Sequence, residues 1–219
     1  EEFKLRRCES VDEVNSIVAR PNDMVTLSLS TLLYGGTHLP IPELLAELCA
    51  WTQTLPCQWP LQAHRICVGM EALNVLLGPD LPEPLGLKEL LACYEFLQTE
   101  PSSQSKSRQP YLRCRAYNQL ITGNSDSNRG YTQDVTVVEG HWLHHNDMIL
   151  PSRPGRVLNT KENKATVASK LMGLGEPNVE SLEVALNWWG PNGDDAGARD
   201  AERLLTCSSP TTCKGNDFK

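Results

Sequence analysis

The stretch YLRCRAYNQLITGNSDSNRGYTQDVTVVEGHWLHHND, residues 111–147, decides the fold class, because it contains the clearest strand patterns in this chain of 219 residues. Residues 111–121 and 131–139 alternate apolar with polar side chains, and a loop rich in Gly, Asn, Asp and Ser joins the two runs. This period of two is typical of half-buried strands. The stretch therefore predicts a β-hairpin, which residues 141–150 can extend into an antiparallel β-meander.

Helical patterns lie on both sides of the meander. Apolar residues recur at helical spacing in residues 40–56, 61–78, 86–98, 159–175, 177–190 and 194–205. An earlier segment alternates instead and predicts a strand over Val25–Leu29, which can pair with the meander. The sequence therefore predicts an α+β fold, with a mainly helical N-terminal part after one early strand, a central antiparallel β-meander and C-terminal helices.

The clearest break in the chain is TEPSSQSKSRQP, residues 99–110, which is polar and rich in Ser. Such a composition is typical of linkers and long loops. We expect a mainly helical part over residues 1–100, a linker over 101–110, and a second part with the meander and further helices over 111–219. Pairing of the early strand with the meander would make these parts one continuous domain.

Charge is distributed unevenly along the chain. The formal net charge is −7, and residues 1–100 carry 6 Lys and Arg against 14 Asp and Glu. Residues 101–160, by contrast, carry 7 Lys and Arg against 4 Asp and Glu. Since an acidic protein repels polyanions, we expect any contact with phosphate groups on this middle segment. No apolar run approaches the roughly 20 residues that a membrane-spanning helix needs.

The first strand of the predicted meander carries a basic and aromatic face. Alternation places Tyr111, Arg113, Arg115 and Tyr117 on one side of the strand, and Arg129 adds positive charge on the following loop. Arginine and aromatic planes on an open sheet face are typical of single-stranded nucleic acid binding. The same residue types dominate protein–protein hot spots, and they are also ordinary on solvent-exposed strands. This face is the predicted binding site.

A cysteine nucleophile is the main enzymatic alternative. Such a thiolate needs a neighbouring imidazole and is activated at a helix N-terminus, as in papain-like cysteine hydrolases. Cys57 precedes a predicted helix and is better placed than Cys49, which lies inside one. His141 would act as the base, and Asp147 or Asn146 would orient it. No family signature surrounds either cysteine.

A metal site could be formed by three histidines, because imidazole is a common metal ligand. The spacing of His141, His144 and His145, however, does not suit such a site. A strand places His141 and His145 on one face and His144 on the other, so we predict no metal ion here. The order HHNDMILPSRPGRVLN also resembles the metal-binding core of ββα-metal nucleases, which implies roles for His144, His145 and Asn159 around a divalent ion. The interval to the proline departs from that pattern, and no downstream histidine supplies a further ligand.

Five of the eight cysteines fall into two kinds. Cys49, Cys67 and Cys93 lie at apolar helical positions and are predicted to be buried free thiols. Cys207 and Cys213 flank SSPTT in a polar segment and are the disulfide candidates. No Asn-x-Ser/Thr sequon occurs, which slightly favours an intracellular protein. The chain starts Glu-Glu-Phe-Lys without a signal-peptide pattern, so we expect a processed or excised chain.

No coherent catalytic set emerges from these patterns. Neither a Gly-rich phosphate loop nor a G-x-S-x-G motif occurs, and we expect no cofactor. The leading hypothesis is a non-enzymatic binding or assembly protein, such as an adaptor, a coat or matrix subunit, or an interaction module. We expect its partner to be a protein or another copy of itself. The alternatives are the cysteine hydrolase and a single-stranded nucleic acid binding protein.

Overall fold

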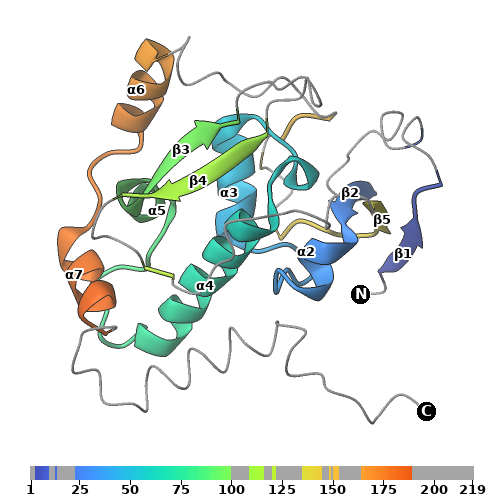
Figure 1. Cartoon of the computed structure of the whole chain (residues 1–219). Coiled ribbons are helices and arrows are strands. Elements are labelled where there is room, and N and C mark those ends of the chain that lie inside the picture. The colour runs from blue at the N-terminus through green and yellow to red at the C-terminus, as the bar shows by residue number, and fades with distance from the viewer. Residues whose placement is uncertain are drawn as a thin grey trace.

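The structure is a computed structural model, and its elements are drawn in Figure 1. It describes residues 3–9, 13, 23–99, 109–115, 120–121, 135–144, 148, 150–152 and 164–188, with only the backbone described for 164–168. In chain order the elements are β1 (Lys4–Arg7), β2 (Met24–Ser28), α2 (Leu29–Leu33), α3 (Glu43–Thr52), the 3-10 helix η1 (Pro56–Gln58), α4 (Leu61–Leu77), α5 (Leu87–Cys93), β3 (Tyr94–Gln98), β4 (Pro110–Cys114), β5 (Val135–Glu139), α6 (Lys164–Gly173) and α7 (Val179–Trp188). The predicted α+β class, with antiparallel strands between helices, is confirmed. The helix predicted over 194–205 lies outside the described residues.

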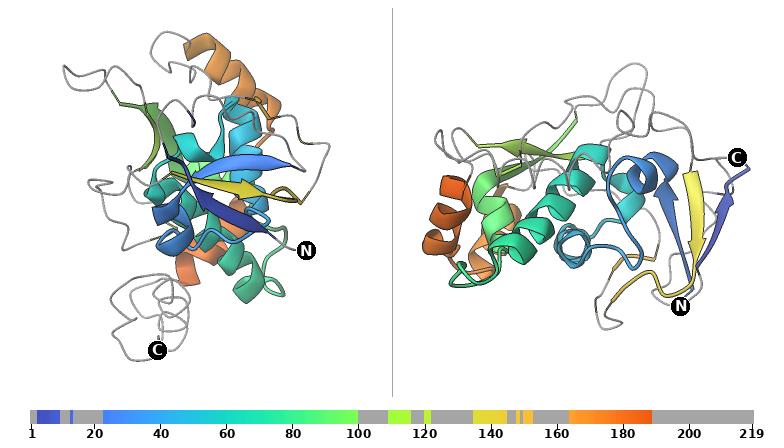
Figure 2. Two further views of the ribbon diagram at one scale, coloured as in Figure 1. Left: turned by 90° about the vertical axis from the view of Figure 1, so that its right-hand side faces the viewer. Right: turned by 90° about the horizontal axis from the view of Figure 1, so that it is seen from below.

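Two antiparallel sheets organise the strands. In the three-stranded sheet β5 lies between β1 and β2, with Val138 opposite both Leu5 and Val25. In the second sheet β3 and β4 form a two-stranded ribbon. Figure 2 shows the three-stranded sheet at one end of the molecule and α7 at the other. Each sheet thus joins strands from both sides of the predicted linker, whereas the division into two domains stays a prediction.

Pairing differs from the predicted hairpin in one respect. The strands β4 and β5 lie where alternation predicted them, but β4 pairs with β3 and β5 pairs with β1 and β2. The expected contact between the early strand and the meander is confirmed by the β2–β5 pairing. The described residues of segment 141–150 belong to no strand. Strand β1 was not predicted, because all four of its side chains are exposed and show no alternation.

The helix predicted over residues 86–98 is the clearest error. Helix α5 ends at Cys93, and the chain continues directly as strand β3. Tyr94 and Phe96 are buried, whereas Glu95 and Leu97 are half-buried, which is the alternation of a strand with one face on the core. Aromatic side chains at alternate positions favour such a half-buried strand.

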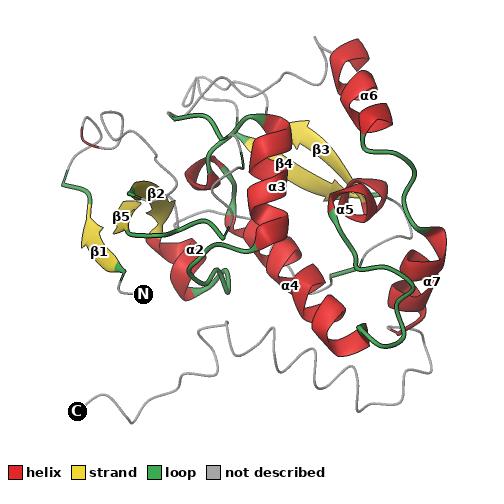
Figure 3. Cartoon of the chain, turned by 180° about the vertical axis from the view of Figure 1, so that it is seen from behind, coloured by secondary structure: helices red, strands yellow, loops and turns green. Residues whose placement is uncertain are grey.

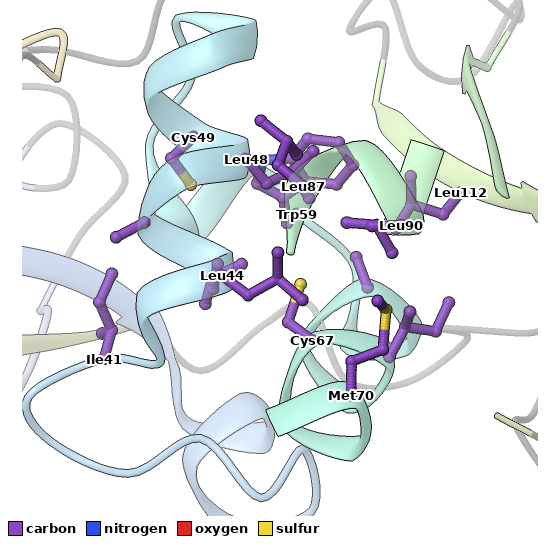
Figure 4. Packing of buried hydrophobic residues seen from close by; sticks show 14 of the residues in the cluster. Ile41, Leu44, Leu48, Cys49, Trp59, Cys67, Met70, Leu87, Leu90 and Leu112 are labelled. Carbon is purple, nitrogen blue, oxygen red and sulfur yellow. The ribbon is translucent and has the colours of Figure 1, made fainter. Parts of the chain in front are cut away.

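The core lies between α3, α4 and α5 and the inner face of the β3–β4 ribbon (Figure 4). Leu48 of α3, Met70 of α4, Leu90 of α5 and Leu112 of β4 are each almost fully buried. Seen from behind, α3 lies in front of the ribbon, so the ribbon covers one side of this helix (Figure 3). This packing leaves the opposite face of the ribbon outside the core.

Helix α4 also approaches the segment that follows β4. Gly69 leaves the necessary space, because a Cβ atom at this position would lie 2.7 Å from Cδ1 of Ile121. The backbone N–H of Ile121 donates a hydrogen bond of 2.9 Å to the Tyr94 hydroxyl. The ribbon is therefore tied to the helices through Ile121 as well as through its own inner face.

Buried polar contacts attach α7 to α5. The Glu89 carboxylate is fully buried and accepts hydrogen bonds from the backbone N–H groups of Gly86 at 2.9 Å and Asn178 at 2.8 Å. The hydroxyl of Ser181 donates to the carbonyl of Glu83 at 2.8 Å and accepts from its N–H at 3.1 Å. Since these bonds satisfy groups on both partners, they fix the start of α7 against α5.

Helix α6 is held against α3 by two residues. The Lys170 ammonium donates to the Trp51 carbonyl at 2.7 Å and lies 6.0 Å from the centroid of the indole ring. The indole Nε1 of Trp51 lies 3.5 Å from the Lys170 carbonyl. This reciprocal contact sets the position of the C-terminal end of α6, which borders the site described next.

Candidate functional site

The outward face of the β3–β4 ribbon is the candidate site. Its side chains alternate with those that enter the core, since Leu112 is buried while Tyr111 is half-buried and Arg113 exposed. Register places Tyr111 opposite Leu97 and Arg113 opposite Glu95 on the neighbouring strand. We call the group formed by Glu95, Leu97, Tyr111, Arg113 and Arg115 the outward ribbon face.

An ion pair crosses this face. The Arg113 guanidinium donates to the Glu95 carboxylate at 2.6 Å, and the side chains are 62% and 39% exposed. Its hydrogen bond with the carboxylate raises the pKa of Arg113 above its usual value. Because the pair is well exposed, solvent screens it and its main effect is to hold the two side chains side by side. The pair also places a negative charge on a face that was predicted to be only basic and aromatic.

Arg115 follows the end of β4 and marks the border between the ribbon and the C-terminal helices. Its backbone N–H donates to the Cys93 carbonyl at 2.8 Å, which continues the ladder by one step beyond Cys114. Its side chain is exposed, and no carboxylate in the described part of the chain forms an ion pair with it. Arg115 therefore offers a guanidinium group that a ligand can pair with.

A pocket of about 300 Å³ lies beside Arg115, between α5 and the turn from α6 to α7. Its lining consists of Lys88, Leu91, Ala92, Arg115, Leu171, Leu174, Gly175 and Pro177. The site thus has two adjoining parts, an open strand face and a small hollow, and Arg115 contributes to both. A pocket of this size is at the lower end of the range for small-molecule sites.

Two members of the predicted binding face cannot be placed. Tyr117 and Arg129 lie outside the described residues. Tyr111, Arg113 and Arg115 lie as the alternation predicted, with Leu112 on the opposite, buried side. Sequence reasoning missed Glu95 and Leu97, which belong to the strand that was assigned as a helix. The aromatic alternation of Tyr94 and Phe96 was the signal that could have identified them.

The electrostatics of Cys57 differ from those of an activated nucleophile. The residue lies in η1, ahead of α4, and burial raises the pKa of its thiol although a hydrogen bond with Thr26 acts in the opposite direction. Catalytic cysteines need a lowered pKa, so this environment favours the neutral thiol. Cys49 is fully buried in α3, and burial raises its pKa further. Asp147 of the predicted hydrolase site lies outside the described residues.

The predicted histidine residues are only partly described. His141 and His144 are exposed and lie beyond the end of β5, separated by the buried pair Trp142 and Leu143. His145, and Asn159 of the nuclease resemblance, lie outside the described residues. Among the side chains that are described, no three His, Cys, Asp or Glu residues gather as a metal site requires.

The cysteines predicted to be free and buried are confirmed as such. Cys49, Cys67 and Cys93 form no disulfide and are inaccessible to solvent. The disulfide candidates Cys207 and Cys213 lie outside the described residues, so their pairing stays a prediction.

Two further findings concern membrane-spanning helices and similarity to known proteins. Within the described ranges, no helix combines the length and the apolar character needed to cross a membrane. No protein-family model, curated protein or solved structure matches this chain, so the site has to be interpreted from its own geometry.

Proposed function

We propose that this chain is a non-enzymatic assembly protein whose outward ribbon face binds an acidic protein surface, supplied by a second copy of the chain. The main support for the proposal is that the two faces of the β3–β4 ribbon differ in burial. One face is buried in the core, while the other presents Leu97, Tyr111, Arg113 and Arg115 together. Tyrosine and arginine beside an apolar residue are the side chains that most often dominate protein interfaces.

Charge supports a second copy as the partner. The first 100 residues carry 14 Asp and Glu against 6 Lys and Arg, whereas Arg115 lacks a carboxylate partner among the described residues. A face with two arginines against one glutamate, on a chain whose first 100 residues are acidic, favours head-to-tail contact, because opposite potentials attract.

Nucleic acid fits the face less well than protein does. The Glu95 carboxylate lies within 2.6 Å of the Arg113 guanidinium and would repel a phosphate approaching that arginine. A protein surface can instead offer a carboxylate to Arg115 and an apolar group to Leu97 and Tyr111. The raised pKa of Cys57 likewise gives no support to a hydrolase.

Sedimentation equilibrium of the full chain tests the proposal. We expect the wild-type protein to self-associate, and Arg113→Ala with Arg115→Ala to weaken association by more than tenfold, which corresponds to about 1.4 kcal/mol. Thermal unfolding should be nearly unchanged, because both side chains are exposed.

The matched control is Arg6→Ala. Arg6 is also an exposed strand arginine in ion pairs with glutamates, Glu13 and Glu139, but it lies in the other sheet. Association should survive this change. A wild-type chain that stays monomeric at every accessible concentration overturns the proposal. Tight binding of single-stranded oligonucleotides with steep salt dependence would favour the nucleic acid alternative instead.

A further inference from the structure

We propose that the pocket between α5 and the α6–α7 turn binds a small aliphatic carboxylate, with Arg115 holding the carboxylate group. This site goes beyond the proposed assembly function and shares only Arg115 with the outward ribbon face. Its lining comes from α5, the residue after β4, the end of α6 and the following turn.

Most of the lining is apolar. Leu91 is 5% exposed, and the other apolar members are half-buried. These apolar residues are Leu91, Ala92, Leu171, Leu174 and Pro177. An aliphatic chain placed here removes apolar surface from water on both sides, which is the source of affinity in small-molecule sites.

Two cations complete the lining, and their charges are balanced differently. The Lys88 ammonium lies 3.4 Å from the Glu83 carboxylate and 3.9 Å from that of Glu89. Its charge is therefore already partly compensated. Arg115 has no such carboxylate in the described part of the chain, and the neighbouring Cys93 thiol is neutral. Among the described residues, Arg115 is therefore the cation of the pocket that has no carboxylate counterion.

The buried carboxylate beside the pocket does not supply that anion. Both oxygens of Glu89 already accept backbone hydrogen bonds, from Gly86 and from Asn178, and its side chain is fully buried. Glu89 instead holds two segments that line the pocket in place, because its carboxylate connects the start of α5 to the turn before α7. The frame of the site is thus set before any ligand arrives.

The balance of charge selects the chemical class of the ligand. A single guanidinium without a carboxylate partner in the described part of the chain matches one negative charge, and its planar fork suits the two oxygens of a carboxylate. A phosphate dianion would need the Lys88 ammonium as well, which already lies 3.4 Å from the Glu83 carboxylate. The apolar lining adds the requirement for an aliphatic tail. The shared chemistry is therefore a monocarboxylate with a short hydrocarbon chain.

Titration of the full chain with butanoate, hexanoate and octanoate, followed by NMR, tests the inference. We expect affinity to rise roughly three- to fourfold for each added methylene until the pocket is filled. Hexanoate should bind at least about tenfold more tightly than hexanamide, its neutral analogue, because only the acid pairs with Arg115.

Three variants separate the contributions. Arg115→Gln should weaken hexanoate about tenfold and leave hexanamide unchanged, while Ala92→Leu should fill the hollow and weaken both ligands. Arg6→Gln removes an exposed arginine of the other sheet that does not line the pocket, and it should leave hexanoate binding unchanged.

The inference is overturned if hexanoate does not bind, if hexanamide binds equally well, or if neither Arg115→Gln nor Ala92→Leu weakens hexanoate. A failure of the assembly proposal is distinguishable, because self-association is measured without carboxylate and responds to Arg113. Carboxylate binding can therefore hold in a monomeric chain, and assembly can hold in a chain that binds no carboxylate.

Discussion

His64 and His38 are placed in environments that change their pKa values in opposite directions. His64 is fully buried in α4, with Nδ1 2.8 Å from the Thr37 hydroxyl and Nε2 3.1 Å from the Pro56 carbonyl. Burial lowers the pKa of His64 to about 4. His38 is more exposed, and its interaction with the Glu71 carboxylate raises its pKa. The neutral form of His64 and the charged form of His38 are therefore favoured by folding.

These opposite shifts predict opposite contributions to stability. The unfolded chain binds a proton at His64 below about pH 6.5, whereas the folded chain resists it down to about pH 4. The contribution of His64 is therefore present above pH 6.5 and lost as pH falls toward 4, by roughly 3 kcal/mol in total. The contribution of His38 is present below pH 6.5 and lost as pH rises through its raised folded-state pKa.

Urea unfolding of His64→Gln and His38→Gln at several pH values measures both contributions. The free energy of unfolding of His64→Gln should depend less on pH between 4 and 6.5 than that of the wild type. His38→Gln serves as the control, since it should retain this dependence. If the free energy of unfolding has the same pH dependence in the wild type and in His64→Gln, then folding does not lower the pKa of His64.

Burial also predicts the reactivity of the cysteines. Burial raises the pKa values of the Cys49 and Cys67 thiols, and both side chains are inaccessible. Alkylation by N-ethylmaleimide near pH 7 should leave these two thiols unmodified in native protein and modify them in urea. Among the described cysteines, Cys8 and Cys114 are half-buried and should react before Cys49 and Cys67. Mass spectrometry of proteolytic fragments makes the comparison within one sample.

At the scale of the elements, the Glu89 carboxylate joins the start of α5 to Asn178, the residue before α7, through two hydrogen bonds. Glu89→Ala leaves the N–H groups of Gly86 and Asn178 without their acceptors in a buried place. We expect a loss of roughly 2–5 kcal/mol in the free energy of unfolding and faster hydrogen exchange in α7. Glu83→Ala is the matched control, because Glu83 contacts Ser181 only through its backbone. Similar losses in both variants would contradict this role for Glu89.

Sequence predicted the helices α3, α4, α6 and α7 and the strands β2, β4 and β5, because each has a clear period and recognisable ends. The prediction failed where a helical pattern changes directly into a strand pattern, without a Gly or Pro to mark the boundary. Cys93 and Tyr94 are consecutive, yet one ends a helix and the other begins a strand, with no Gly or Pro between them. The Leu-rich pattern of α5 was therefore extended into β3. Tertiary pairing with β4 decides this boundary, and local sequence does not report it.

The same reasoning applies to the candidate site. Alternation alone predicted that Tyr111, Arg113 and Arg115 share a face opposite Leu112. The neutralising partner Glu95 was not predicted, since its position depends on the register between two strands. The pocket was not predicted either, because its lining comes from segments that are far apart in the chain. Cross-strand register and helix packing are properties of the fold rather than of any single segment.

At the scale of the whole molecule, the two halves of the fold differ in how local their contacts are. Helices α3 and α4 are neighbours in the chain and pack together, whereas β2 meets its partner β5 across more than a hundred residues. Forming such a distant pair costs more loop-closure entropy. In pulsed hydrogen exchange during refolding, we expect α4 amides to gain protection before those of β2. Simultaneous protection would show that the sheet forms with the helices.

The central position of β5 also matters while the protein is being made. A ribosome adds roughly 5–20 residues per second, so β1 and β2 emerge on the order of ten seconds before Val135–Glu139 is synthesised. During that interval both early strands lack the neighbour that lies between them in the finished sheet. Unpaired strands readily associate with other extended chains. The segment that contains β1 and β2 is therefore open to misassembly until β5 has been made, and a chaperone bound to it would prevent such association.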